Sequence, residues 1–216
     1  MVTISRAICL GAILGMLAPA MLEAQWTPLF NQKNLDGWES AGDGVWSVTS
    51  DGVVVGQRDF AKQPEHQAWL YSKKEFEEFD LHVEWWTRFR GNSGVSIRDT
   101  SRGRYSFGKE YERNKTPSHI GYEIQISNGY ESDEYGSGSI YLFAKAKTGA
   151  LRMNDWNAFD IESRKNRISV RLNGQLVAEH PGEAGRPLKG PIGFQLHDRN
   201  SIIMLRNCRI REVQPR

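Results

Sequence analysis

The feature that most constrains the fold is a succession of short segments in which apolar and polar residues alternate, each ending at a turn signal. Alternation with a period of two is typical of a β-strand with one buried face, and no long stretch shows the period of an amphipathic helix. The Asn-Gly pair at 173–174, between RISVRL and QLVAEH, is the strongest hairpin signal. Strands are predicted at 46–48, 53–56, 69–71, 79–89, 94–98, 122–127, 139–142, 157–163, 167–172, 175–180, 190–196 and 202–212.

Strands at this spacing predict an all-β protein built as a two-sheet antiparallel β-sandwich. The length of 216 residues suits one domain, and we expect residues 25–216 to form it. Two polar segments, 57–68 and 99–120, interrupt the strand pattern. Long loops inside compact domains are usually either functional or disordered, so both readings stay open for these segments.

The N-terminus is typical of a signal peptide over residues 1–24. Arg6 supplies a positive charge, and the apolar run at 8–18 is too short to span a bilayer. Cleavage is predicted after Ala20 or after Ala24. The sequence therefore predicts an exported protein, periplasmic or secreted, with no membrane span after cleavage. Removal of Cys9 would leave Cys208 alone among apolar neighbours, which predicts a buried thiol and no internal disulfide.

Charge and motif content narrow the classes of partner. A net charge of +2 gives no electrostatic basis for binding nucleic acid, and we expect none. No His-x-His, HExxH or cysteine pair is present, so no cofactor is evident. Glu123 and His197 could still meet across strands and hold a divalent cation with water. Whether the protein has a metal site is left open.

The segment GYEIQIS carries the most informative polar stripe. Alternation sends Glu123, Gln125 and Ser127 to one face of the strand and apolar side chains to the other. A retaining β-glucanase of the sandwich type would carry a second carboxylate on this face, about 5 Å from the first. Positions 127 and 128 are Ser and Asn, so that partner is missing. The stripe thus argues against an ordinary retaining glycosidase.

Further candidate site residues come from three other segments. His197 can exchange protons near neutral pH, although a histidine in a strand is often structural. Arg98 presents a planar fork for paired oxygens, and Tyr141 could stack on a sugar or belong to the core. The predicted catalytic residues are Glu123 and His197, and the predicted substrate-binding residues are Asn92, Ser93, Arg98, Gln125, Tyr141 and Gln195.

Seven segments in order carry a resemblance to a known family. They are NQKNLDGW, WSVTSDGVVVG, FEEFDLHVEW, GNSGVSIR, GYEIQIS, DWNAFDIESRKNRISVRLNGQLVAE and GPIGFQLHDRNSIIMLRNCRIREV, between residues 31 and 213. Together they resemble the bacterial 3-keto-disaccharide hydrolase domain family. The resemblance implies a concanavalin A-like jelly roll, export, and action on glycosides oxidised at C3. It also implies a pathway link to a sugar 3-dehydrogenase.

The hypothesis that follows is β-elimination from a 3-keto-glycoside. A ketone at C3 acidifies the proton at C2, a base removes it, and the enolate expels the C1 substituent, with or without later addition of water. The route needs one base, one proton donor and donors for the enolate oxygen. Glu123 and His197 are proposed as base and acid in either order, with Arg98, Asn92 and Gln125 as donors.

The alternative is a non-catalytic, lectin-like carbohydrate-binding module, because the same sandwich serves both purposes and a fold does not fix a function. Such a module would use exposed aromatic side chains as platforms for an oligosaccharide or glycoside. The tryptophan candidates are Trp38, Trp85, Trp86 and Trp156, of which Trp38 and Trp156 are expected rather to anchor the core.

Overall fold

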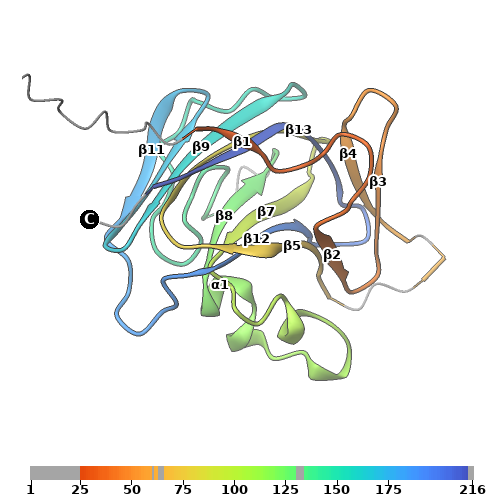
Figure 1. Ribbon diagram of the computed structural model, residues 1–216, viewed down its shortest axis with the longest axis horizontal. Helices are drawn as coiled ribbons and strands as arrows, with labels where there is room; N and C mark the ends of the chain where they lie inside the picture. The colour runs from red at the N-terminus through yellow and green to blue at the C-terminus, as the bar shows by residue number, and fades with distance from the viewer. Residues whose placement is uncertain (1–24, 60, 63–65, 130–133, 214–216) are drawn as a thin grey trace, which may run out of the picture.

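Two antiparallel sheets form the molecule in a computed structural model that describes residues 25–59, 61–62, 66–129 and 134–213. One sheet has eight strands in the order β11-β10-β9-β6-β13-β4-β3, with β1 paired to β13. The other has five strands in the order β2-β5-β12-β7-β8. Figure 1 shows the two sheets as stacked layers, which confirms the predicted all-β sandwich.

Most strands follow the predicted pattern with small shifts at their ends, but β5 continues to Phe76 and not only to the predicted Tyr71. The eight-stranded sheet contains β1 (Thr27–Pro28), β3 (Gly44–Val48), β4 (Val54–Arg58), β6 (Phe79–Thr87), β9 (Asn157–Arg164), β10 (Arg167–Leu172), β11 (Gln175–His180) and β13 (Ile202–Glu212). The five-stranded sheet contains β2 (Trp38–Ala41), β5 (Ala68–Phe76), β7 (Asn92–Ile97), β8 (Tyr122–Ser127) and β12 (Gly190–Leu196).

Three features of the strand pattern differ from the prediction. The two-residue strand β1 was not predicted. The sequence WESA of β2 is too polar to alternate clearly, and this strand was not predicted. The strand predicted at 139–142 is instead a turn, in which Ile140 makes isolated bridges to Ile124 and Ala144. A buried hydrophobic residue between a strand and a turn gives the same alternation in the sequence as a short strand, which explains the wrong prediction.

The core lies between the sheets and is built from alternate residues. Leu81, Val83 and Trp85 of β6 are fully buried, and so are Ile124 and Ile126 of β8. The predicted hairpin joins β10 to β11, where Asn173 and Gly174 have φ angles of 51° and 83°. Two successive positive φ angles are the requirement of a type I′ turn, for which Asn-Gly is the preferred pair.

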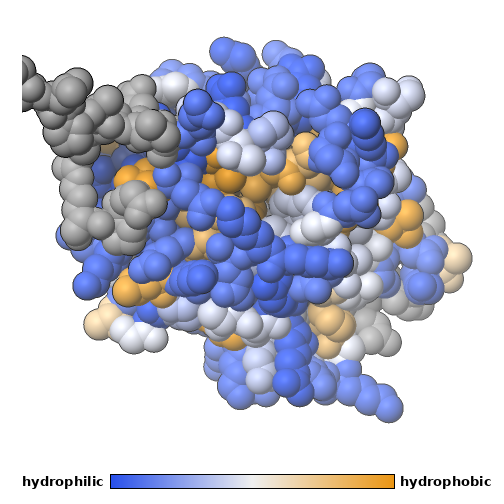
Figure 2. All heavy atoms as spheres, viewed as in Figure 1, coloured by the Kyte–Doolittle hydropathy of each residue, from blue (hydrophilic) through white to orange (hydrophobic). Residues whose placement is uncertain are grey.

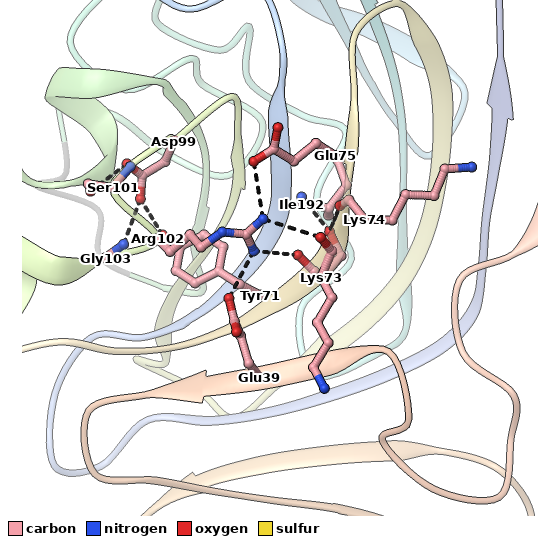
Figure 3. A network of polar contacts seen from close by, with 11 residues as sticks. Glu39, Tyr71, Lys73, Lys74, Glu75, Asp99, Ser101, Arg102, Gly103 and Ile192 are labelled. Carbon is pink, nitrogen blue, oxygen red and sulfur yellow. Dashed lines mark hydrogen bonds and ion pairs between the residues drawn. The ribbon is translucent and has the colours of Figure 1, made fainter.

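The segment 99–120 is folded over the face of the five-stranded sheet that is turned away from the core (Figure 1). It contains three short 3₁₀ helices at 104–106, 108–110 and 113–115, followed by α1 (Pro117–Ile120). Figure 3 shows how its first residues are anchored. The Arg102 guanidinium donates hydrogen bonds to the backbone oxygens of Ser72 and Lys73, and the Tyr71 hydroxyl donates to the buried carboxylate of Asp99 at 2.6 Å.

The face of the molecule in Figure 2 is mostly hydrophilic, and its hydrophobic residues show mainly as a band across the upper middle of the view. Within the described part of the chain, no helix has the length and apolar character needed to cross a bilayer. Cys208 is a buried free cysteine, as predicted, and burial raises the pKa of its thiol. The predicted signal peptide at 1–24 lies outside the described residues.

Candidate functional site

A pocket of about 660 Å³ opens on the outer face of the five-stranded sheet. Its floor is formed by strand residues whose side chains alternate away from the core, and its walls come from the segments 99–120 and 134–142. The floor and wall residues that line it are Gln67, Asn92, Tyr111, Arg113, Thr116, Ser118, His119, Glu123, Gln125, Glu134, Tyr135, Tyr141, Leu142, Gln195 and His197. Six of the eight predicted site residues therefore share one pocket.

Glu123 lies on the pocket floor and is only 4% exposed. It is placed there by β8, where it pairs with Ser96 of the neighbouring strand β7. The carboxylate occupies space next to Gly94, because a Cβ atom added at Gly94 would stand 2.4 Å from Oε1 of Glu123. The glycine thus provides the room in which this carboxylate is buried.

The environment of Glu123 disfavours its charged form. Burial is the main cause, and with the negative charge of Asp99 it raises the pKa of Glu123 from 4.5 to about 7. His197 and the side chain of Gln195 lower the pKa, but burial exceeds their effect. A carboxyl group with this pKa can accept or donate a proton near neutral pH.

Three amide side chains line the pocket together with the carboxyl group of Glu123. The Gln125 amide donates a hydrogen bond to Oδ1 of Asn92 at 3.1 Å, which fixes the orientation of both side chains. Gln195 is buried beside Glu123 and lies close enough to lower its pKa. Its amide makes no hydrogen bond of good geometry among the described residues, so it has capacity for a bound ligand.

The rim of the pocket carries an imidazole and tyrosine rings. The His197 side chain is 45% exposed, and Nδ1 lies 3.9 Å from the Asp198 carboxylate. Tyr135 and Tyr141 have ring centroids 5.1 Å apart. Aromatic faces and amides are the groups with which proteins bind sugars, because they match C–H faces and hydroxyls respectively.

The alternation of polar and apolar residues did not predict which side chains of the segment 99–120 line the pocket. His119 lies on α1 and lines the pocket, with Nδ1 2.8 Å from Oγ1 of Thr116. Burial, followed by the charges of Arg186 and Arg113, lowers the pKa of His119. These residues lie outside any strand, so the alternation that identified Glu123 gave no signal for them.

The structure corrects the prediction for Ser93. Its neighbour Asn92 faces the pocket, so Ser93 must face the core, where its hydroxyl donates to the backbone oxygen of Gln195 at 2.6 Å. This serine is 1% exposed and does not line the pocket. It is a structural residue of the sheet.

The prediction for Arg98 is also wrong. Continued alternation would direct its side chain into the pocket, but Arg98 has a φ of 62° and the strand has already ended. Its guanidinium donates to the backbone oxygen of Arg164 in the eight-stranded sheet at 2.7 Å. Arg98 thus connects the two sheets and cannot act as a donor to the enolate.

None of the predicted tryptophan platforms lines the pocket. Trp38 and Trp85 are buried in the core. Trp86 lies in a strand of the other sheet, and Trp156 lies under the guanidinium of Arg206. The tyrosines of the loops, rather than the tryptophans, supply the aromatic surface of the site.

A second carboxylate does reach the pocket, although not from the strand. Glu134 belongs to a wall segment and pairs with Lys145 at 2.8 Å, and its side chain is 64% exposed. Among the residues described, no group of three or more His, Cys, Asp and Glu side chains could hold a metal ion. The chemistry that the arrangement supports is proton transfer by Glu123 beside neutral donors.

Comparisons with solved structures identify proteins that share this fold. A protein from Parabacteroides distasonis that carries the provisional name glycosyl hydrolase is 28% identical, with a TM-score of 0.68. The match covers 88% of this chain and 100% of that one. Carbohydrate-binding module CBM66 from Bacillus subtilis is 16% identical, with a TM-score of 0.55 and coverage of 82% and 96%.

A β-glucanase from Bacillus licheniformis shares the fold with a TM-score of 0.53 and 15% identity, over 89% of this chain and 99% of that one. These similarities confirm the concanavalin A-like jelly roll. Among curated proteins, none matches the chain. The family model described as a 3-keto-alpha-glucoside-1,2-lyase-like domain matches residues 25–211. The chain therefore belongs to the 3-keto-alpha-glucoside-1,2-lyase-like domain family.

Proposed function

We propose that the pocket cleaves 3-keto-glycosides by removing the proton at C2 and eliminating the substituent at C1. The observation that carries the proposal is a buried carboxyl group, Glu123, whose pKa of about 7 suits proton transfer at neutral pH. The membership of the chain in a 3-keto-alpha-glucoside-1,2-lyase-like family supports the same chemistry.

The reaction differs from ordinary glycoside hydrolysis in its demands on the protein. Loss of the C2 proton gives an enolate conjugated with the C3 oxygen. Expulsion of the C1 substituent then gives an enone and an alcohol, and addition of water to the enone would complete a net hydrolysis. Two flanking carboxylates are not needed, because the ketone of the substrate supplies the acidity. Glu123 alone can therefore supply the carboxyl group that this reaction needs.

The enolate oxygen needs neutral donors that are already in position. The buried Gln195 amide and the Nδ2 group of Asn92 are the candidates, since the Asn92 oxygen is occupied by Gln125. Tyr135 and Tyr141 at the rim would contact the sugar or the leaving group. His197 would interact with Glu123 and with a substrate hydroxyl.

The test uses methyl 3-keto-α-glucoside, and NMR follows the alkene proton of the product and the released methanol. We expect the wild-type protein to consume this substrate and to leave methyl α-glucoside unchanged. The substitution Glu123→Gln should lower the rate about 100-fold, the lower range for losing a proton-transfer group. The matched control is Glu179→Gln, on the exposed face of β11. No methanol release by the wild-type protein would overturn the proposal.

The second candidate function is carbohydrate binding without catalysis. The paired tyrosine rings at the rim and the amides of the floor favour it, and so does the fold shared with CBM66. This reading predicts saturable binding of an unoxidised oligosaccharide, measured by calorimetry, with no product. Binding that is lost in Tyr141→Ala, together with an inert 3-keto-glycoside, would favour this second reading.

One further proposal concerns the supply of the substrate. A 3-keto-glycoside must be supplied by an enzyme that oxidises a sugar at C3, so we propose a sugar 3-dehydrogenase as the preceding step.

A further inference from the structure

His119 is held in a defined position on the wall of the pocket. Its Nδ1 atom lies 2.8 Å from Oγ1 of Thr116, a buried residue that precedes α1. Arg186 ties the same turn to the rest of the molecule, because its guanidinium donates to the backbone oxygens of Ser118, at 2.9 Å, and Gly121. The imidazole is thus positioned by a side-chain bond and by a clamped backbone.

The hydrogen bond at Nδ1 leaves the other ring nitrogen for a ligand. No described residue forms a hydrogen bond with Nε2 of His119. If Nδ1–H donates to Thr116, the threonine hydroxyl can donate onward to Oγ of Ser118, 3.2 Å away. In that tautomer Nε2 carries a lone pair, which is the form that accepts a proton.

The charges around His119 oppose its protonation. Arg186 and Arg113 are the cations that act on it, and both, after burial, lower the pKa of the imidazole. The other titratable groups that line the same pocket are Glu123, Glu134, His197 and the phenols of Tyr111, Tyr135 and Tyr141. The pKa of Glu123 is shifted in the opposite direction, to about 7. Near neutral pH the pocket thus presents a neutral imidazole and a carboxyl group that is protonated in a large fraction of molecules.

We propose that His119 removes the C2 proton and that Glu123 protonates the departing glycosidic oxygen, an assignment that rests on the proposed function. The C2–H bond breaks as an N–H bond forms at Nε2, and the electron pair enters the enolate. The enolate then re-forms the ketone and a C1=C2 double bond, while the C1–O bond breaks and the oxygen takes the Glu123 proton. Return of the proton from His119 to Glu123 through water restores the starting state. Opposite pKa shifts are the usual mark of such a pair.

The experiment compares two leaving groups. Methyl 3-keto-α-glucoside releases an alkoxide that needs a proton, whereas 4-nitrophenyl 3-keto-α-glucoside releases a stabilised phenolate that does not. His119→Ala should slow both substrates about 100-fold or more. Glu123→Gln should slow the methyl substrate by a similar factor and the 4-nitrophenyl substrate only a few-fold. Added imidazole should restore part of the rate of His119→Ala.

Controls separate catalysis from folding. His82→Ala changes a histidine of the eight-stranded sheet and should leave both rates unchanged. His119→Asn retains a group that can bond to Thr116, and it should be folded by circular dichroism yet as slow as the alanine variant. A wild-type protein inactive on both substrates overturns the proposed function together with this assignment. An active wild-type protein with an equally active His119→Asn variant overturns this assignment alone.

A readout independent of activity is the tautomer of His119. Nitrogen-15 NMR of the wild-type protein should show the Nδ1–H tautomer, with protonation of the ring only below its ordinary pH range. Arg186→Ala should raise the pKa of His119, since a cation is removed from its surroundings. An Nε2–H tautomer in the wild-type protein would overturn the proposal.

Discussion

At the scale of single residues, the site depends on the burial of one carboxyl group. Glu123 lies in a space that Gly94 leaves open, with the negative charge of Asp99 nearby. Both conditions favour the neutral acid over the carboxylate. The protein thus retains a group that is useful in proton transfer and that costs stability whenever it ionises.

The stability of the protein should therefore depend on the protonation of Glu123. Its pKa is about 7 in the folded protein and near 4.5 in the unfolded chain, so the folded state retains the proton to higher pH. The free energy of unfolding should fall as pH rises from about 4.5 to above 7, by about 3 kcal/mol from this group. Urea unfolding of Glu123→Gln should lack this decline, so that the variant gains stability over wild type at pH 8. Equal pH slopes for the variant, wild type and the control Glu179→Gln would contradict the prediction.

The space at Gly94 gives a second test. Gly94→Ala would place a Cβ atom 2.4 Å from Oε1 and 2.9 Å from Cγ of Glu123, so the carboxyl group must move out over the floor. We expect the rate on methyl 3-keto-α-glucoside to fall about 10-fold or more, at a cost of about 1–3 kcal/mol in stability. Gly136→Ala is the matched control, because a Cβ there meets nothing within 4 Å. A wild-type rate in Gly94→Ala would show that the position of the carboxyl group is unimportant.

At the scale of residues, the sequence predicted correctly which side chains share one face of the sheet where the strands are regular. Alternation brought Glu123, Gln125, Gln195 and His197 to one pocket. The same rule excludes Ser93, because adjacent residues of a strand face opposite sides. Arg98 could not be excluded in this way, since only its positive φ shows that the alternation has stopped.

At the scale of elements, the wall segment 99–120 is the part whose structure was predicted least well from the sequence. Its apolar residues show no periodicity, because each side chain contacts its own individual partner and the segment has no long strand or helix with one buried face. Its ordered path depends on anchors such as Arg102 and Asp99 (Figure 3). The strands, by contrast, were predicted because their burial repeats every second residue.

The anchor at Arg102 can be tested by hydrogen exchange. Arg102→Ala removes donors to the oxygens of Ser72 and Lys73 and the ion pairs with Glu39 and Glu75. We expect faster amide exchange throughout 99–120 and a higher KM, because the wall of the pocket is less ordered. The control Arg104→Ala loses an exposed ion pair with Glu110 and a contact with the Tyr105 ring, both within the same segment. Similar exchange in the two variants would argue against an anchoring role.

At the scale of the whole molecule, the two sheets have different tasks. The eight-stranded sheet packs its inner face against the core and exposes a charged outer face, where Asp80 pairs with Arg164 and Arg211. The five-stranded sheet uses its outer face for the pocket. The sandwich class was predictable from turn spacing, whereas the depth of the pocket was not, because it depends on loops.

We propose that the protein is exported and that residues 1–24 are removed as a signal peptide during export. Expression of the full sequence in a bacterial host should give an exported protein whose mass corresponds to a start at Met21 or Gln25. The folded domain tolerates either site, because β1 begins only at Thr27. A full-length mass in the exported fraction would contradict cleavage.

One consequence follows from where the segment 99–120 is inserted. It joins β7 to β8, which are hydrogen-bonded neighbours in register from Asn92–Ser127 to Ile97–Tyr122. The ends of the insertion are thus held together by the sheet, so its length and composition can change at small entropic cost. The wall that carries His119 is thus an insertion that can change without altering the strands that form the floor. Related chains could acquire new selectivity, or lose catalysis and keep only binding, by replacing this insertion while Glu123 and its strand remain unaltered.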